Sequence, residues 1–296
     1  MSQRRNRAVL LALGAVLPIS GCTLIPTTRK LPIPKPPEVT QTAEGAQLVE
    51  QLNQHWKALE SLTATVELQA SVIKSKEGGA KDYPSLRGHI LMRKPGNLRV
   101  LGQYFGVRSF DMASDGNNFT LYIPPQSRAI LGSNTLRKRA KNPLENLRPG
   151  FFLDALLVRG LASDDEYMVT ADTITVEDPA RKHLYLVPEY KLTILRDKPG
   201  NPAQKIPLRV VTFRRDDLLP SSQEIFDAEG NLETQVYYSN YKDFGDSKYP
   251  SQVLIKRPLE EVQVSLAVES VKENQQLTDD QFKIKLPEGT KLQHLD

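Results

Sequence analysis

Residues 64–72 read ATVELQASV, and apolar and polar residues alternate along this stretch with a period of two. Successive side chains of a β-strand point to opposite faces, so the pattern predicts a long strand with one apolar and one wet face. Residues 262–268, VQVSLAV, repeat the alternation near the other end of the chain. The chain is therefore expected to be built mainly from half-buried strands.

The same two-residue alternation recurs in the rest of the chain, in segments separated by short turns. Pro95-Gly96 and Asp115-Gly116 mark two of the turns, the second suited to a hairpin with positive φ. Strands joined by short turns must be antiparallel, because parallel pairs need long crossovers. The further strands expected are Leu86–Lys94, Asn97–Phe105, Val107–Ala113, Asn118–Ile123, Arg128–Gly132, Tyr167–Val176, His183–Val187, Lys191–Arg196, Leu208–Arg214, Gln223–Phe226, Glu233–Tyr241, Pro250–Arg257 and Glu261–Val271.

Two helices are expected beside the strands. Gln41–Leu59 carries an apolar stripe at helical spacing that includes the only tryptophan, Trp56, and it would begin at an N-cap on Thr40 or Thr42. Phe151–Val158 is apolar on nearly all sides, so it must be buried or must cover a cavity. The predicted fold class is mainly β with a few helices, in which one large curved antiparallel sheet is covered by these two helices.

The N-terminus has the three parts of a secretory signal: basic residues from Arg4 to Arg7, the apolar stretch Ala8–Leu17, and small residues at Ser20-Gly21. The apolar stretch is about half of the ~20 residues that span a bilayer. Ile19–Cys22 resembles the lipobox of bacterial lipoproteins, which implies that Cys22 is acylated and becomes the mature N-terminus. A signal peptide cleaved elsewhere is the alternative.

These features divide the chain into a signal peptide (1–21), a lipidated cysteine with a proline-rich tether (22–41) and a single β domain (42–296). Cleavage removes three arginines and no acid from a chain with 39 Lys+Arg and 35 Asp+Glu, so the exported protein is nearly neutral. The one basic cluster, Arg137–Lys141, is typical of a solvated loop, and a contact with an anionic lipid or a partner is the alternative. The sequence does not support nucleic acid as a partner, because phosphate recognition needs a sustained basic face.

No residue pattern points to catalysis, a metal or a cofactor. The four histidines (55, 89, 183 and 294) have no short-range partner, and no cysteine remains after Cys22 to complete a metal site. The acidic residues at 164–166 and 279–280 follow loops, where capping explains them. The chain is therefore expected not to be an enzyme. A hydrolase with carboxylates assembled from separate strands is the weakest alternative.

What remains is apolar surface, enclosed between the sheet and the two helices. It forms either a packed core or a cavity for an apolar ligand, and the sequence leaves both open. If it is a cavity, alternation selects the following lining residues: Leu91, Leu98, Val100, Phe119, Leu121, Phe151, Phe152 and Leu156.

The order of elements resembles the outer-membrane lipoprotein-sorting (LolA/LolB-like) family. Arg93–Val100 is similar to that family's hairpin of a strand, Pro-Gly and an alternating strand, and it is followed by Ser114-Asp115-Gly116. Residues resembling the family's closing segment are Asn274, Leu277, Phe282, Leu286-Pro287 and Gly289. The resemblance implies an open half-barrel that is lidded by helices and binds acyl chains.

The lipobox makes the membrane-anchored receptor of that family the nearer relative, because the carrier has no lipid. That receptor exposes a hydrophobic residue on a loop between early strands, whereas the loop Ser75–Asp82 carries none. Thr23 stands where the sorting rule of enteric bacteria places aspartate for inner-membrane retention, which implies the outer membrane, facing the periplasm.

The sequence thus predicts an envelope lipoprotein, tethered to the membrane through Cys22, that binds an apolar ligand or the acyl chains of lipoproteins. The alternative is a structural or regulatory envelope protein that has a filled core and acts through protein partners.

Overall fold

The structure is a computed structural model that describes residues 39–74, 78–135, 148–178 and 183–295. The chain divides into two compact units, Met1–Ile33 and Pro34–Asp296, and only the second contains described residues. The expected signal peptide, Cys22, the tether up to residue 38 and the basic run Arg137–Lys141 lie outside the described residues.

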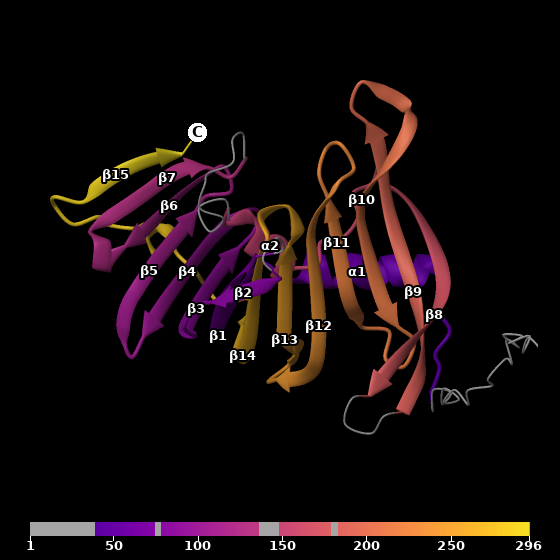
Figure 1. Ribbon diagram of the computed structural model, residues 1–296. Helices are drawn as coiled ribbons and strands as arrows, with labels where there is room; N and C mark the ends of the chain where they lie inside the picture. The colour runs from indigo at the N-terminus through magenta and orange to yellow at the C-terminus, as the bar shows by residue number, and fades with distance from the viewer. Residues whose placement is uncertain (1–38, 75–77, 136–147, 179–182, 296) are drawn as a thin grey trace, which may run out of the picture. The chain divides into compact units, whose positions relative to one another are not determined.

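One open, curved sheet forms the framework of the second unit (Figure 1). Its order is β15-β7-β6-β5-β4-β3-β1-β14-β13-β12-β11-β10-β9-β8, and β2 pairs with β1 beside this path. The strands are β1 Ser61–Lys74, β2 Gly79–Asp82, β3 Leu86–Arg93, β4 Asn97–Tyr104, β5 Val107–Ser114, β6 Asn118–Ile123, β7 Arg128–Ser133, β8 Glu166–Asp178, β9 His183–Lys198, β10 Asn201–Arg214, β11 Pro220–Phe226, β12 Leu232–Phe244, β13 Ser247–Arg257, β14 Val262–Glu273 and β15 Lys291–Leu295.

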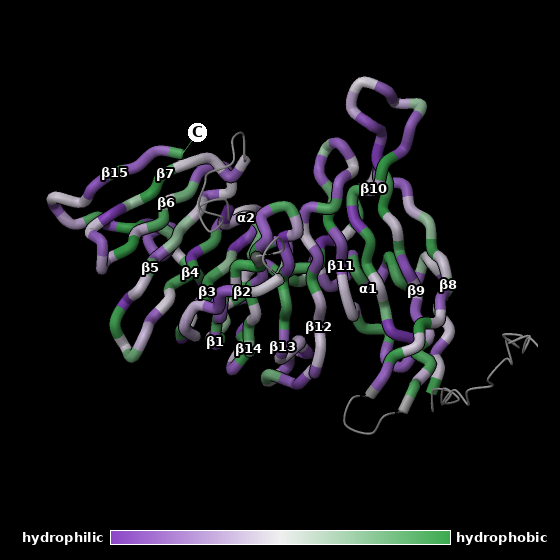
Figure 2. Tube along the Cα trace, viewed as in Figure 1, coloured by the Kyte–Doolittle hydropathy of each residue, from purple (hydrophilic) through white to green (hydrophobic). Residues whose placement is uncertain are grey.

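The two alternating stretches that predict the fold lie side by side at the middle of the sheet. β1 pairs antiparallel with β14, so that Val66 is opposite Val268 and Leu68 is opposite Leu266. Apolar residues of both strands therefore share one face, and Figure 2 shows hydrophobic and hydrophilic residues interspersed along the strands. The register shifts at a β-bulge between Thr65 and Val66. Thr65 lies opposite Ser270, so Glu269 of β14 is skipped in the pairing.

The predicted fold class is confirmed, with three differences at the level of strands. β15 was not expected, and it joins the sheet parallel to β7, which is possible because the long segment after β14 carries the chain to that edge. Ser75–Asp82 was expected to be a turn, but its second half forms β2 against the end of β1.

Pro188 does not divide β9, although two strands were predicted around it. Pro188 lies opposite Thr173 of β8, but its carbonyl accepts from the backbone N–H of Arg215 on the other side of β9. Its missing N–H therefore faces the β10 side, where the ladder with β9 begins only at Glu189. The expected N-cap of the first helix was also wrong. Glu44 caps it, and the backbone N–H of Glu44 donates to Oε1 of Gln47 at 2.8 Å.

Two helices of the described chain pack on the sheet at different places. α1 (Gly45–Ala58) buries Leu48 and Leu52 against β9 and β10, where Leu192 and Phe213 are fully buried. α2 (Gly150–Leu156) packs on the central strands, in one hydrophobic cluster with residues of β1, β3, β4, β12, β13 and β14. The face of the central strands that α2 contacts is called the covered face below.

Candidate functional site

The covered face and α2 form the largest apolar assembly of the described residues. Five residues of α2 are buried in it, among them Phe151 and Phe152, whose ring centroids lie 4.1 Å apart. Opposite them the sheet presents side chains such as Val66, Ile90 and Leu266, which are at most 1% exposed. The space between helix and sheet is thus filled by the protein's own side chains.

Three buried polar side chains hold the C-terminal carbonyls of α2. The amide of Gln223 donates to the carbonyl of Asp154 at 2.5 Å and to the hydroxyl of Tyr238 at 2.7 Å. That hydroxyl donates to the carbonyl of Ala155 at 2.7 Å, and the Tyr249 hydroxyl donates to the carbonyl of Leu156 at 2.8 Å. These bonds satisfy C-terminal carbonyls of α2, which have no partner within the helix, as at the end of any α-helix.

Burial keeps these tyrosines protonated. It raises the pKa of Tyr238 and of Tyr249 far above the usual value for a phenol, and the neighbouring tyrosines raise both further. Burial raises the pKa of Tyr241 as well, and the carboxylate of Asp217 adds to the shift. Each hydroxyl therefore remains a donor across the physiological pH range.

An apolar cavity of about 280 Å³ adjoins this assembly, at the place where both helices meet β12 and β13. Leu52 of α1 and Leu156 of α2 line it together with Val158. Its other walls are Leu219, Pro220, Tyr238, Tyr241, Tyr249 and Pro250. Polar groups stand at the same cavity: Gln51, His55, Asp246, Ser247, Lys248 and Glu273. Its volume is near the lower end of the ~300–1,000 Å³ that is usual for small-molecule sites.

Most of the lining residues selected from the sequence come together, but as packed core. Leu98, Val100, Phe151, Phe152 and Leu156 belong to the cluster under α2. Leu156 is the only one of the eight that also lines the apolar cavity.

The other three candidate residues lie at or beyond the border of this cluster. Leu121 is partly buried and packs against it. Phe119 is buried, and the guanidinium of Arg148 lies 5.2 Å from its ring centroid. Leu91 alternates along β3 with the core residues Ile90 and Met92, so its side chain points to the opposite face.

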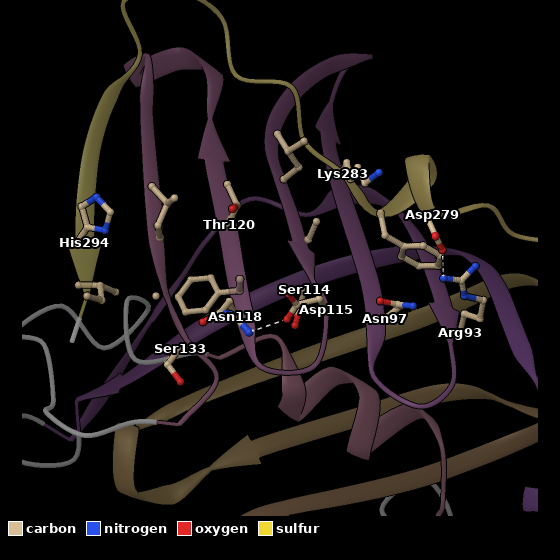
Figure 3. A pocket seen from close by; sticks show the side chains of 17 residues that line it. Arg93, Asn97, Ser114, Asp115, Asn118, Thr120, Ser133, Asp279, Lys283 and His294 are labelled. Carbon is tan, nitrogen blue, oxygen red and sulfur yellow. Dashed lines mark hydrogen bonds and ion pairs between the residues drawn. The ribbon is translucent and has the colours of Figure 1, made fainter.

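A larger cavity of about 920 Å³ lies between strands of the β3–β7 side and the C-terminal segment, and both polar and apolar side chains line it (Figure 3). Arg93 and Asn97 line it from opposite positions on β3 and β4. The Arg93 guanidinium donates to the Asp279 carboxylate at 2.5 Å. Asp115 accepts from the backbone N–H groups of two following residues, which lower the pKa of its carboxyl. Apolar side chains, among them Phe119, Leu131 and Phe282, complete the walls, so the lining of this cavity is mixed.

A second cavity with a mixed lining, of about 480 Å³, lies at the start of α2. Its charged side chains are largely paired with one another. Arg159 contacts Asp154 at 2.5 Å, and Arg257 contacts Glu233 at 3.2 Å while also binding the hydroxyl of Thr234. No unbalanced charge among these groups selects an anionic or cationic ligand.

The hairpin between β4 and β5 ends in an apolar tip, which the sequence reasoning missed. Phe105 is 90% exposed, and its neighbours Tyr104 and Val107 are 46% and 68% exposed. Phe105 has φ +47°, a left-handed conformation that is unusual for a bulky side chain. The residues 104–107, YFGV, are called the hairpin tip below. Three large apolar residues around Gly106 are the sequence signal for this tip, but they also fit the ends of the two predicted strands.

The described part of the chain also bears on metal binding and on membrane crossing. No three His, Cys, Asp or Glu side chains in that part of the chain come together as a metal site. None of its helices combines the length and apolar character needed to cross a membrane.

No family model matches this chain, and no curated protein matches it either. Among solved structures it is similar to a LolA superfamily protein from Nitrosomonas europaea, at 14% identity and a TM-score of 0.49, over 82% of this chain and 99% of the other. A DUF1329 family protein from Desulfovibrio piger matches at 14% identity and a TM-score of 0.49, over 81% and 95%. Lipoprotein LppX from Mycobacterium tuberculosis matches at 12% identity and a TM-score of 0.26, over 80% and 99%. The family resemblance indicated by the sequence is a distant one and concerns the fold alone.

Proposed function

We propose that this chain is a non-enzymatic lipoprotein of the bacterial envelope, anchored through Cys22, that binds an acyl chain or another apolar ligand between its sheet and its helices. It would serve lipoprotein or lipid trafficking, most simply at the outer membrane. The observation that carries the proposal is the apolar cavity of about 280 Å³ at the junction of α1, α2, β12 and β13.

The composition of this cavity fits a ligand with an apolar tail and a polar head. Its walls are aliphatic, aromatic and proline side chains, whereas Lys248 and His55 stand among its polar groups. Apolar walls with a few polar groups are typical of small-molecule sites. A carboxylate or ester head would be bound at Lys248, and the tail would extend toward Leu156.

A long acyl chain needs more room than this cavity, and α2 occupies the adjoining space. Moving α2 would expose the apolar covered face and would free the hydroxyls of Tyr238 and Tyr249 and the amide of Gln223. A buried donor that loses its partner costs about 1–3 kcal/mol. A ligand that replaced α2 would therefore need polar atoms near these three groups.

The hairpin tip supports the membrane part of the proposal. An exposed group of large apolar side chains is usually a site of contact with a partner or a membrane. The anchored receptor of the family that the sequence resembles exposes a hydrophobic residue on a loop between early strands. Ser75–Asp82 carries none in this chain, so the hairpin tip would take that role. Phe105 would insert into the lipid interface.

Substitution of Val158 by Trp tests the ligand site, because Val158 lines the cavity and the larger side chain would fill it. A fluorescent fatty acid should bind the unit Pro34–Asp296, and Val158→Trp should weaken its binding at least about tenfold, a loss of ~1.4 kcal/mol. Val39→Trp is the matched control, since Val39 is 58% exposed and lines none of the three cavities. Equal binding by the two variants would count against the site.

The second candidate function, a protein-binding role with a filled core, is favoured by the close packing of α2 on the covered face. If the protein has this role, the fluorescent fatty acid should bind neither the wild-type unit nor the Val158→Trp and Val39→Trp variants. A protein partner would then be crosslinked in cells without any lipid bound to the domain.

A further inference from the structure

The cavity of about 920 Å³ has its floor on the face of the sheet away from α2. One row of side chains crosses β5, β6, β7 and β15 on this floor, each directly opposite the next: Ala113, Thr120, Leu131 and His294. Met112, the neighbour of Ala113, belongs to the cluster under α2, so the row points to the other face. This cavity is therefore separate from the apolar cavity of the proposed function.

The C-terminal segment contributes a wall that is fixed to the sheet. Phe282 lines the cavity and ends the short 3₁₀-helix η5 (Asp279–Phe282), in which it is buried. The guanidinium of Arg93 lies 5.1 Å from the centroid of its ring. Arg99 of β4 donates to the backbone carbonyl of Gln281 at 2.9 Å. Two arginines of the sheet thus hold this wall in place.

Three uncharged polar side chains that line the cavity have hydrogen-bonding capacity to spare. They are the amides of Asn97 and Asn118 and the hydroxyl of Thr120 (Figure 3). Within the described part of the chain these three side chains make no hydrogen bond. An amide and a hydroxyl can each both donate and accept. They therefore suit a ligand whose own groups also do both, as the hydroxyls of a sugar do.

The charges of the lining balance within the described residues. Besides His294, two basic and two acidic side chains line the cavity: Arg93, Lys283, Asp115 and Asp279. Arg93 is paired with Asp279. Lys283 contacts Asp280 at 3.2 Å. Asp115 accepts from two backbone N–H groups. Charge therefore gives no preference for an anionic or a cationic ligand.

Apolar side chains share the lining with these polar groups. Leu131 lies directly opposite Thr120 in the floor row, and Phe282 forms part of the wall. A long acyl chain would take the asparagine amides out of water without giving them a partner, which costs free energy. A ligand with a short apolar group on an uncharged hydrogen-bonding frame fits both parts of the lining. The acetamido group of an N-acetylated sugar has a methyl group beside an amide that donates and accepts.

We propose that this cavity binds an uncharged saccharide chain that carries N-acetyl groups. Its hydroxyls and amides bind Asn97, Asn118 and Thr120, and its methyl groups pack on Leu131 and Phe282. The volume is near the upper end of the ~300–1,000 Å³ that is usual for small-molecule sites, which leaves room for more than one sugar ring. A peptide cannot bind here as an added strand, because the floor is a sheet face whose backbone groups already pair with neighbouring strands.

Titration calorimetry of the full chain, solubilised in a detergent without sugar groups, tests the class of ligand. The probe is chitotetraose, a chain of four N-acetylglucosamine units, and the matched control is cellotetraose, in which hydroxyls replace the acetamido groups. We expect chitotetraose to bind at least about fivefold more tightly than cellotetraose and than the single sugar N-acetylglucosamine. Absence of chitotetraose binding, or an equal affinity for either comparison sugar, would overturn the proposal.

Two neighbouring asparagines test the place of binding. Asn118→Ala removes an amide that lines this cavity, whereas Asn117→Ala removes one that does not. Both residues are exposed, so both variants should fold alike. Asn118→Ala should weaken chitotetraose binding about three- to tenfold, as for a lost hydrogen bond, and Asn117→Ala should leave it unchanged. Equal affinities of the two variants would show that the sugar does not bind in this cavity.

Discussion

At the scale of single residues, the buried hydroxyls beneath α2 are the most informative groups. Tyr238 and Tyr249 supply donors to helix carbonyls in an otherwise apolar cluster. A buried hydroxyl without a partner would cost free energy, so the two rings and α2 are held in one arrangement. The sequence pattern placed these tyrosines on strands but gave no sign that they bind a helix, because their partners are 83 and 93 residues away.

The protonation of these tyrosines predicts a loss of stability at alkaline pH. Their pKa values are raised in the folded chain, whereas in the unfolded chain they are near 10. Above about pH 10 the unfolded chain therefore holds fewer protons, and the free energy of unfolding falls as pH rises.

Urea unfolding at several pH values between about 9 and 11 measures this dependence. A Tyr238→Phe, Tyr249→Phe double variant should be less stable at neutral pH, by roughly 1 kcal/mol for each hydrogen bond lost. Its stability should also fall less steeply with pH. Identical slopes for variant and wild type would show that these phenols ionise normally.

The ring of Phe110 occupies the space that a side chain at residue 102 would need, so this position favours glycine. A Cβ added at Gly102 would lie 2.3 Å from Cε1 of that ring, so Gly102→Val must displace the aromatic side chain. Overpacking of this kind typically costs about 1–3 kcal/mol. The midpoint of urea unfolding checks this, with Gly79→Val as control, because no atom lies within 4 Å of the Cβ position at Gly79. Equal midpoints would refute the packing argument.

At the scale of elements, both helices were predictable from their apolar patterns, but their roles were not. The stripe of α1 indicated a helix that docks, and the all-round apolar character of Phe151–Val158 indicated burial. Which strands receive each helix depends on the sheet order, and that order follows from long-range pairings such as β1 with β14. A single sequence does not reveal these pairings.

The docking of α1 predicts a large effect at Leu48, which is fully buried against β9 and β10. Leu48→Ala should lower the free energy of unfolding by about 2–5 kcal/mol, because the removed side chain leaves a cavity. Lys57→Ala, on the exposed surface of the same helix, should change it by no more than about 0.5 kcal/mol. A small effect at both positions would mean that α1 does not contribute to the core.

At the scale of the whole molecule, alternation over many strands was enough to predict a large antiparallel sheet, since short turns exclude other connections. β15 was missed because five residues at the chain end carry too little pattern, and its parallel pairing with β7 has no local signal. The candidate site was predicted only in part. Alternation identifies apolar residues such as Leu98 and Val100, but it cannot distinguish a packed core from a cavity.

The proposed tether and the hairpin tip assign two membrane contacts to one molecule. Insertion of Phe105 predicts that Phe105→Ser weakens binding of the unit Pro34–Asp296 to lipid vesicles several-fold, because a large apolar side chain leaves the interface. Co-sedimentation with phosphatidylethanolamine–phosphatidylglycerol vesicles measures this. Val176→Ser is the matched control, since Val176 is also exposed but lies on β8. An equal loss in both variants would contradict a specific role for the hairpin tip.

The central claim, that an apolar ligand binds between the sheet and the helices, is tested most directly by photolabelling with a diazirine-bearing fatty acid. After irradiation of the unit Pro34–Asp296, mass spectrometry of its peptides locates the label. We expect it on Leu156, Val158 and Tyr241, which line the apolar cavity. Absence of label, or label confined to the hairpin tip, would contradict the account.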